Sequence, residues 1–178
     1  MSSVSMIFVK VKNEDIGKTR CPDKQLIYAQ ELRISDIGGN KLIPETEIDK
    51  MPPVELSKEY IGIYHQWDGF PGGVGAALVK SFNSYEEALN LMLYGDESDI
   101  TDGSVIIPYT LRGGGYAKEV DMPPTMYDKI PPDLGKTRWA EYVYLFKDGE
   151  WYYDTASSRP LKQYRWKKVK QYLDKKKR

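Results

Sequence analysis

The segment from Trp139 to Asp154 limits the choice of fold more than any other part of the chain. Two aromatic, β-prone runs, WAEYVYLF and EWYYD, lie on either side of Lys147-Asp148-Gly149. Asp-Gly is a favoured pair for the type I′ turn, which joins two antiparallel strands without splaying them. We therefore expect a β-hairpin with strands near 139–146 and 150–154, and with it an antiparallel sheet.

Further strands are predicted by runs of β-branched and apolar residues. They lie near 5–12, 60–65 and 104–111. In the last of them, Pro108 has no amide proton for the sheet, which restricts that strand to an edge or a bulge.

Three helices are predicted by apolar residues at helical spacing, near 74–82, 84–94 and 161–175. The second has the clearest boundaries. Ser84-Tyr85-Glu86-Glu87 is a capping box, in which the Ser84 hydroxyl accepts from the Glu87 amide. Gly95 suits a left-handed residue at the end of the same helix. The third helix is basic and carries Trp166, Val169 and Leu173 on one predicted stripe.

Two segments predict loops. The acidic cluster Asp96, Glu97, Asp99 and Asp102 is typical of a solvated loop after the second helix. The segment 118–137 contains four prolines and predicts an extended surface loop. Together these patterns predict one α+β domain over 1–178, with a mainly antiparallel sheet, about three helices and a basic C-terminal helix over 161–178.

Composition excludes several kinds of chemistry. The chain has 178 residues with one Cys and one His, so it has no internal disulfide, Cys-rich zinc site or His-based metal cluster. We therefore expect no metal and no cofactor. No run approaches the ~18 to 20 apolar residues needed to cross a bilayer. The start of the chain lacks a secretory signal pattern, so we expect a cytoplasmic protein without membrane contact.

The charge is balanced overall and unevenly distributed. The chain has 26 basic and 26 acidic residues, yet 10 basic residues and one acidic residue fall within 159–178. This tail could bind nucleic acid through phosphate contacts. The favoured interpretation is a surface helix whose positive charge lies on the acidic remainder of its own chain, because dedicated nucleic-acid binders tend to be basic throughout.

The first candidate site follows the predicted strand 60–65. It combines the only imidazole, a carboxylate, an indole and several glycines at a turn that opens onto a helix N-terminus, where free amides favour an anion. The predicted ligand-binding residues here are Tyr64, His65, Gln66, Trp67, Asp68, Gly72 and Gly73. The alternative is that Asp68-Gly69 is only a turn and that Trp67 and Phe70 anchor the core.

The second candidate site is the loop that follows the strand 104–111. Arg112, Gly113 and Gly114 could form a backbone nest for an anion, with bidentate hydrogen bonds from the guanidinium. A flexible connection is the alternative for a run of glycines.

Catalysis is tested by elimination. A Ser/His/Asp triad would need His65, and no Ser lies in a Gly-x-Ser-x-Gly elbow. A hydrolase using His65 with Asp68 as acid and base stays an alternative. We assign no catalytic residue.

The stretch Ile63 to Gly75 resembles a family of uncharacterised proteins from phages, prophages and other mobile elements. Those proteins look like Ile-Tyr-Cys-His-Trp-Asp-Gly-Tyr-Pro-Glu-Gly-Val-Gly, and the resemblance extends over roughly residues 60 to 160. Gln66 stands at the family's His position and His65 at its Cys position. An imidazole at that place is therefore not essential if the proteins share a function.

The resemblance implies a mobile-element context, in which small proteins often act by binding. We expect a non-catalytic binding protein that sequesters a small anionic, nucleotide-derived ligand. The alternative is a protein-protein interaction module that masks a host protein through the 118–137 segment and exposed aromatic residues.

Overall fold

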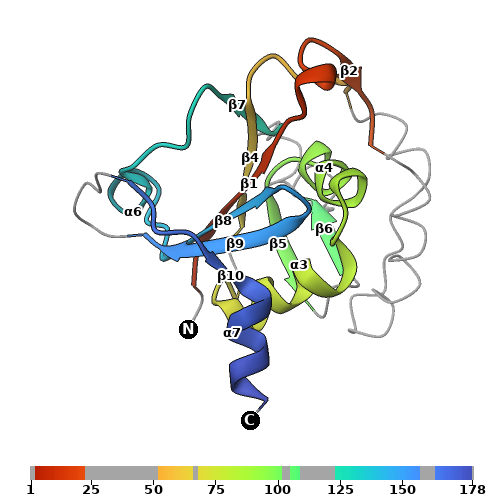
Figure 1. Cartoon of the computed structure of the whole chain (residues 1–178). Helices are drawn as coiled ribbons and strands as arrows, with labels where there is room; N and C mark the ends of the chain where they lie inside the picture. The colour runs from red at the N-terminus through yellow and green to blue at the C-terminus, as the bar shows by residue number, and fades with distance from the viewer. Residues whose placement is uncertain are drawn as a thin grey trace.

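The computed structural model describes residues 3–22, 52–65, 68–101, 105–108, 123–156 and 163–177. Its centre is an eight-stranded mixed sheet in the order β10-β9-β8-β1-β4-β5-β6, with β7 pairing beside β4 (Figure 1). The strands of this sheet are β1 (Ser5–Lys10), β4 (Tyr60–His65), β5 (Glu97–Thr101), β6 (Val105–Pro108), β7 (Thr125–Tyr127), β8 (Tyr142–Lys147), β9 (Glu150–Thr155) and β10 (Lys167–Lys168). A small second sheet pairs β2 (Thr19–Arg20) with β3 (Val54–Glu55).

The helical elements are η1 (Asn13–Asp15), η3 (Pro71–Gly75), α3 (Ala76–Ser81), α4 (Tyr85–Leu93), α6 (Leu134–Thr137) and α7 (Val169–Lys176). Within the sheet, β1 pairs with β8 and β4 with β5 in parallel, and the other pairs are antiparallel. The predicted α+β class with a mainly antiparallel sheet is thus confirmed. Across the described ranges, no helix has the length and apolar character needed to span a bilayer.

The hairpin prediction is confirmed. Strands β8 and β9 pair from Tyr142↔Thr155 to Lys147↔Glu150. Between them, Asp148 and Gly149 have φ values of 51° and 79°, as a type I′ turn requires. Pro108 also lies where expected, since β6 is the last strand at one edge of the sheet.

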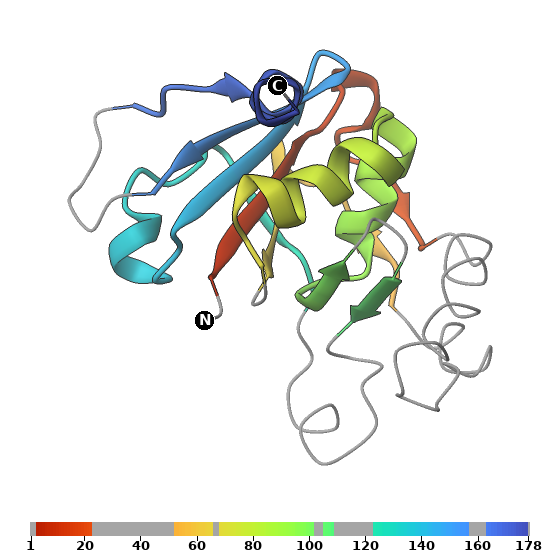
Figure 2. The same ribbon diagram turned by 90° about the horizontal axis from the view of Figure 1, so that it is seen from below.

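Alternate residues of β1 face two separate clusters. Ile7 and Val9 belong to a core on the face covered by α3, α4 and α7, here called the helical face. Met6 and Phe8 lie on the other face with Leu134 of α6. The segment Gln163–Trp166, here called the strap, packs on this second face, here called the strap face. Figure 2 shows α3 and α4 crossing one side of the strands, with α6 at the far end of the sheet.

The caps of α4 follow the sequence prediction. The Ser84 Oγ accepts a hydrogen bond from the Glu87 amide at 3.2 Å and donates to the Glu87 carboxylate at 2.8 Å. Gly95 has φ 82°, the left-handed conformation predicted for it. The helix before it differs from the prediction, because a π-helical turn over Pro71–Gly75 precedes α3.

Two predicted loops contain regular structure. The acidic segment after α4 includes strand β5, which pairs with β4 and β6. The proline-rich segment includes β7 and the short helix α6, and its residues 118–122 lie outside the described ranges. Strands β5 and β7 depend on pairing with β4, which is far away in sequence, and local composition does not reveal such pairing.

The C-terminal helix begins later than predicted. Helix α7 starts at Val169, β10 occupies Lys167–Lys168, and the strap before it is not helical. The Asp154 carboxylate accepts a hydrogen bond from the Arg165 amide at 2.8 Å, which holds this backbone beside β9. Trp166 therefore packs on the strap face, whereas Val169 packs on the helical face.

Candidate functional site

The predicted site after β4 is only partly described. Gln66 and Trp67 lie outside the described residues, as do Arg112, Gly113 and Gly114 of the second predicted site. Tyr64 is partly exposed, with the Arg138 guanidinium 5.7 Å from its ring centre. Its amide donates to the Asp96 carboxylate at 2.9 Å. Burial raises the pKa of Asp96, because its charged form loses water contacts.

His65 lies inside the protein. The side chain is fully buried on the helical face, and its Nε2 accepts a hydrogen bond from the Ile100 amide at 3.1 Å. Burial lowers the pKa of His65 to about 3, so the imidazole is neutral at physiological pH. Among the described residues, its Nδ1 has no hydrogen-bond partner. The geometry therefore makes His65 a core residue that lacks contact with solvent.

The turn that follows uses its own amide groups. The Val74 amide donates to the Asp68 carbonyl at 2.8 Å, and the Gly73 amide donates to the Phe70 carbonyl at 2.9 Å. A Cβ atom on Gly73 would lie 2.5 Å from the Asp68 carbonyl oxygen, which explains the glycine there. Gly72 is exposed. The amides of Gly73 and Val74 therefore do not point freely toward an anion.

A groove on the strap face brings together residues that the sequence analysis did not connect. We call it the strap groove, and its volume is about 460 Å³. Strands β1, β4 and β8 supply its floor, the segment between β7 and α6 supplies one wall, and the strap supplies the other. Its lining consists of Lys10, Tyr60, Lys129, Ile130, Pro132, Leu145, Lys147, Asp148, Gln163, Tyr164 and Trp166.

A hydrogen bond connects the two walls of the groove. The Tyr164 hydroxyl donates to the Pro131 carbonyl at 2.6 Å, which ties the strap to the opposite wall. The rings of Tyr164 and Trp166 are 5.0 Å apart at an angle of 31°, close to offset stacking. Burial raises the pKa of Tyr164, so its hydroxyl stays protonated and continues to donate.

Positive charge converges on this groove. Lys10, Lys129 and Lys147 line it, against one carboxylate, Asp148. In the described part of the chain, none of the three lysines forms an ion pair. The Lys10 ammonium lies 5.8 Å from the centre of the Tyr60 ring, close enough for a cation-π contact. The groove thus places lysine ammonium groups beside aromatic rings.

No sequence motif could have identified this groove. Its three lysines lie at the end of one strand, in a loop and at the start of a hairpin turn, and only the topology brings them together. The one local signal is the alternation Val9, Lys10, Val11, Lys12, which is typical of a strand with one solvent-exposed face and puts Lys10 on that face. Across the ranges that the structure covers, no cluster of three or more His, Cys, Asp or Glu residues could hold a metal ion.

Comparison with known proteins yields no relative for this chain. No protein-family model, curated protein or solved structure matches it. The resemblance to phage and prophage proteins therefore stays a prediction.

Proposed function

We propose that this protein binds a small anionic ligand that carries an aromatic ring, of the nucleotide type, in the strap groove. The observation that carries the proposal is the meeting of three lysines, which form no ion pair within the described ranges, and three aromatic side chains around a volume of about 460 Å³. Ligand sites commonly have volumes of roughly 300 to 1,000 Å³.

The lining suggests how such a ligand is held. Trp166 and Tyr60 are partly exposed rings on which a base can stack, and base-aromatic stacking contributes about 1–3 kcal/mol. The ammonium groups of Lys10 and Lys147 can then contact phosphate oxygens as point charges. The described lining has one carboxylate and no imidazole or thiol, so the role proposed is binding. In the mobile-element context that the sequence predicts, the protein would act by sequestering a nucleotide-derived signal.

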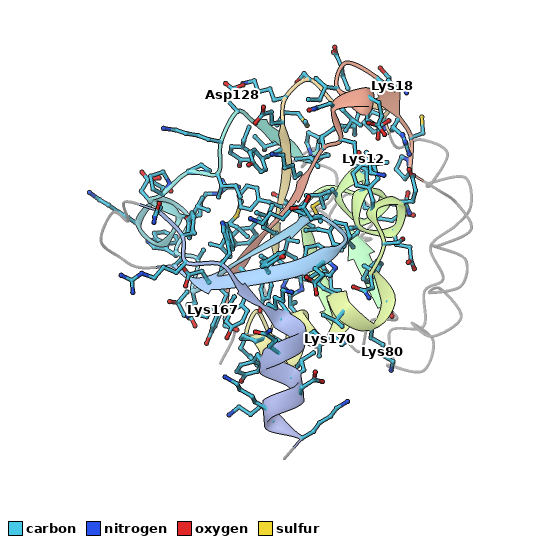
Figure 3. The ribbon with its side chains drawn as sticks, viewed as in Figure 1. Lys12, Lys18, Lys80, Asp128, Lys167 and Lys170 are labelled. Carbon is cyan, nitrogen blue, oxygen red and sulfur yellow. The ribbon has the colours of Figure 1, made fainter. Side chains whose placement is uncertain are left out.

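Thermal-shift measurements with nucleoside phosphates and cyclic dinucleotides test the proposal. A ligand at a hundred times its Kd should stabilise the protein by about 2.7 kcal/mol. Lys10→Ala with Lys147→Ala should weaken the shift strongly, and Trp166→Ala should weaken it for nucleotides but not for inorganic phosphate. Lys80→Ala is the matched control, because Lys80 is an exposed lysine on α3 that does not line the strap groove. In Figure 3 it lies well away from Lys12, which is two residues after Lys10 of the groove. Equal stabilisation by nucleotides and inorganic phosphate would reject the aromatic part of the proposal, and no stabilisation by any ligand would reject all of it.

A second candidate function, binding to another protein, rests on a different residue. Trp139 is 81% exposed and has φ 53°, a left-handed conformation that is costly for a bulky side chain. Exposed aromatic residues are typical anchors at protein interfaces. Affinity capture from a bacterial lysate with wild-type protein and with Trp139→Ala would test it: a partner retained equally by both would remove Trp139 from the interface.

A further inference from the structure

A second hollow lies next to the strap groove. Its volume is about 280 Å³, and it is lined by Lys10, Val11, Lys12, Asn13, Glu14, Tyr85, Phe146, Lys147, Asp148 and Gly149. Lys10, Lys147 and Asp148 line both hollows. Strand β1 ends at Lys10, and the neighbouring strand β8 ends at Lys147. Val9 is opposite Phe146 in this parallel pair, so the two lysines that follow them lie side by side where the two hollows meet.

The second hollow repeats the chemistry of the first. The Lys12 ammonium lies 4.5 Å from the centre of the Tyr85 ring, a cation-π distance. Tyr85 is held in place, because its hydroxyl accepts from the Lys12 amide at 3.1 Å and donates to the Asp15 carboxylate at 2.7 Å. The Tyr85 ring with Lys12 thus lies on one side of the Lys10 and Lys147 pair, and the Tyr164 and Trp166 rings lie on the other.

The lysines that line the two hollows are Lys10, Lys12, Lys129 and Lys147, and, like Lys80 and Lys170, they differ from the lysines that the protein pairs with its own carboxylates within the described ranges. Lys18, Lys58, Lys167 and Lys168 all lie within 4.0 Å of a carboxylate. Within the described ranges, Lys10, Lys12, Lys129 and Lys147 have no such partner. Two carboxylates, Glu14 and Asp148, line the two hollows beside these four lysines. The two hollows together, here called the track, therefore have a net positive charge, whereas the charge of the whole chain is balanced.

We propose that the ligand of this track is a single-stranded oligonucleotide, which runs from the strap groove over Lys10 and Lys147 into the second hollow. This inference rests on the proposed function, because it requires a nucleotide in the strap groove. Single strands bind where a cationic path follows the phosphates and aromatic rings stack on successive bases. A mononucleotide would use the strap groove alone and leave Lys12 and Tyr85 without a role in binding.

Fluorescence anisotropy with labelled oligothymidylates of two, four and six nucleotides, with competition by thymidine monophosphate, tests the inference. We expect affinity to rise at least tenfold from the mononucleotide to the tetranucleotide. Affinity should fall as the salt concentration rises: the logarithm of the association constant should change linearly with the logarithm of the salt concentration, with a slope of about −0.7 for each phosphate contact to a single strand. Lys12→Ala should weaken tetranucleotide binding and reduce the slope by about 0.7, with mononucleotide binding unchanged.

Two further variants complete the design. Lys129→Ala, in the strap groove only, should weaken both ligands, and Lys80→Ala should weaken neither. The oligonucleotide inference would be overturned by equal affinity for the mononucleotide and the tetranucleotide, or by unchanged tetranucleotide binding in the Lys12→Ala variant. Either result would leave the proposed function intact. Equal binding of inorganic polyphosphate or an acidic peptide would also overturn it, because neither carries bases. If neither mononucleotide nor oligonucleotide binds, the proposed function fails as well.

Discussion

Replacement of Asp154 by alanine should release the strap from the sheet. The residue is 7% exposed, and its carboxylate accepts hydrogen bonds from the amides of Arg165 and Thr155, each at 2.8 Å. Hydrogen bonds to a charged group contribute about 1.5–3 kcal/mol each. The ion pair with Lys167 at 3.7 Å involves a half-exposed lysine and adds less than about 1 kcal/mol. The exposed position of Arg165 lets water replace part of the loss, so we expect a total cost of about 3 kcal/mol.

Urea denaturation and amide hydrogen exchange measure this effect. Asp154→Asn keeps the volume and one acceptor oxygen and should cost about half as much as alanine. Asp128→Ala is the control, because the Asp128 side chain is 85% exposed and its contact with Lys58 is 3.9 Å long. It should change stability by less than about 1 kcal/mol. An Asp154→Ala protein with an unchanged urea midpoint and unchanged exchange at Arg165 would refute the argument that this carboxylate fixes the strap.

Three other substitutions probe separate features of the fold. The His65 side chain has a pKa of about 3 in the folded protein and near 6.5 in the unfolded chain, so protonation favours the unfolded state as pH falls from 6.5 toward about 3. The free energy of unfolding should therefore drop by about 1.4 kcal/mol per pH unit in this range. His65→Gln should remove this pH dependence in urea titrations at several pH values, and an unchanged pH dependence would contradict the reasoning. Trp139→Asn should raise the free energy of unfolding by up to about 1 kcal/mol, since asparagine tolerates a left-handed conformation better; a loss of stability would mean that the indole makes contacts that matter. Gly62→Ala should cost about 1–3 kcal/mol by calorimetry, because the new Cβ would lie 2.6 Å from the Phe8 ring; a neutral result would mean that this ring moves freely.

The elements predicted well from the sequence are those with local signals. The hairpin turn depends on Asp148 and Gly149 alone, and strand β4 was predicted with its observed bounds. The start of α4 depends on Ser84 and Glu87, three residues apart. Each of these features is decided by backbone preferences within a few residues, so context changes them little.

The strap shows what local patterns cannot decide. Trp166, Val169 and Leu173 have helical spacing, yet Trp166 packs on one face of the sheet and the other two pack on the opposite face. The chain passes the edge of the sheet between them as β10, which pairs with β9. The Asp154 carboxylate makes this path favourable, and its partner Arg165 lies 11 residues away. Nothing in the spacing of the tail indicates that contact.

The strap groove could not be predicted from the sequence for a similar reason. The glycine-rich entry to the helix predicted free amides for an anion, but backbone carbonyls of the same turn accept the Gly73 and Val74 amides. Glycine there satisfies a steric need, since any Cβ on Gly73 would overlap the Asp68 carbonyl. The strap groove instead depends on side chains brought together by the sheet and by the Tyr164 hydrogen bond to Pro131.

Lys167 and Lys168 of the basic tail and the lysines of the strap groove compete as the place where an anion would bind, and the ion pairs favour the groove over these two tail residues. Lys168 contacts the Glu150 carboxylate at 3.1 Å, and Lys167 contacts Asp154 at 3.7 Å. The pKa of Lys168 is raised by its hydrogen bond to Glu150, so its charge is stabilised by the protein itself. Charge in this part of the tail thus serves the attachment of β10 to β9. An anion would have to displace those carboxylates from Lys167 and Lys168, whereas Lys10 and Lys147 form no ion pair with the residues that the structure describes.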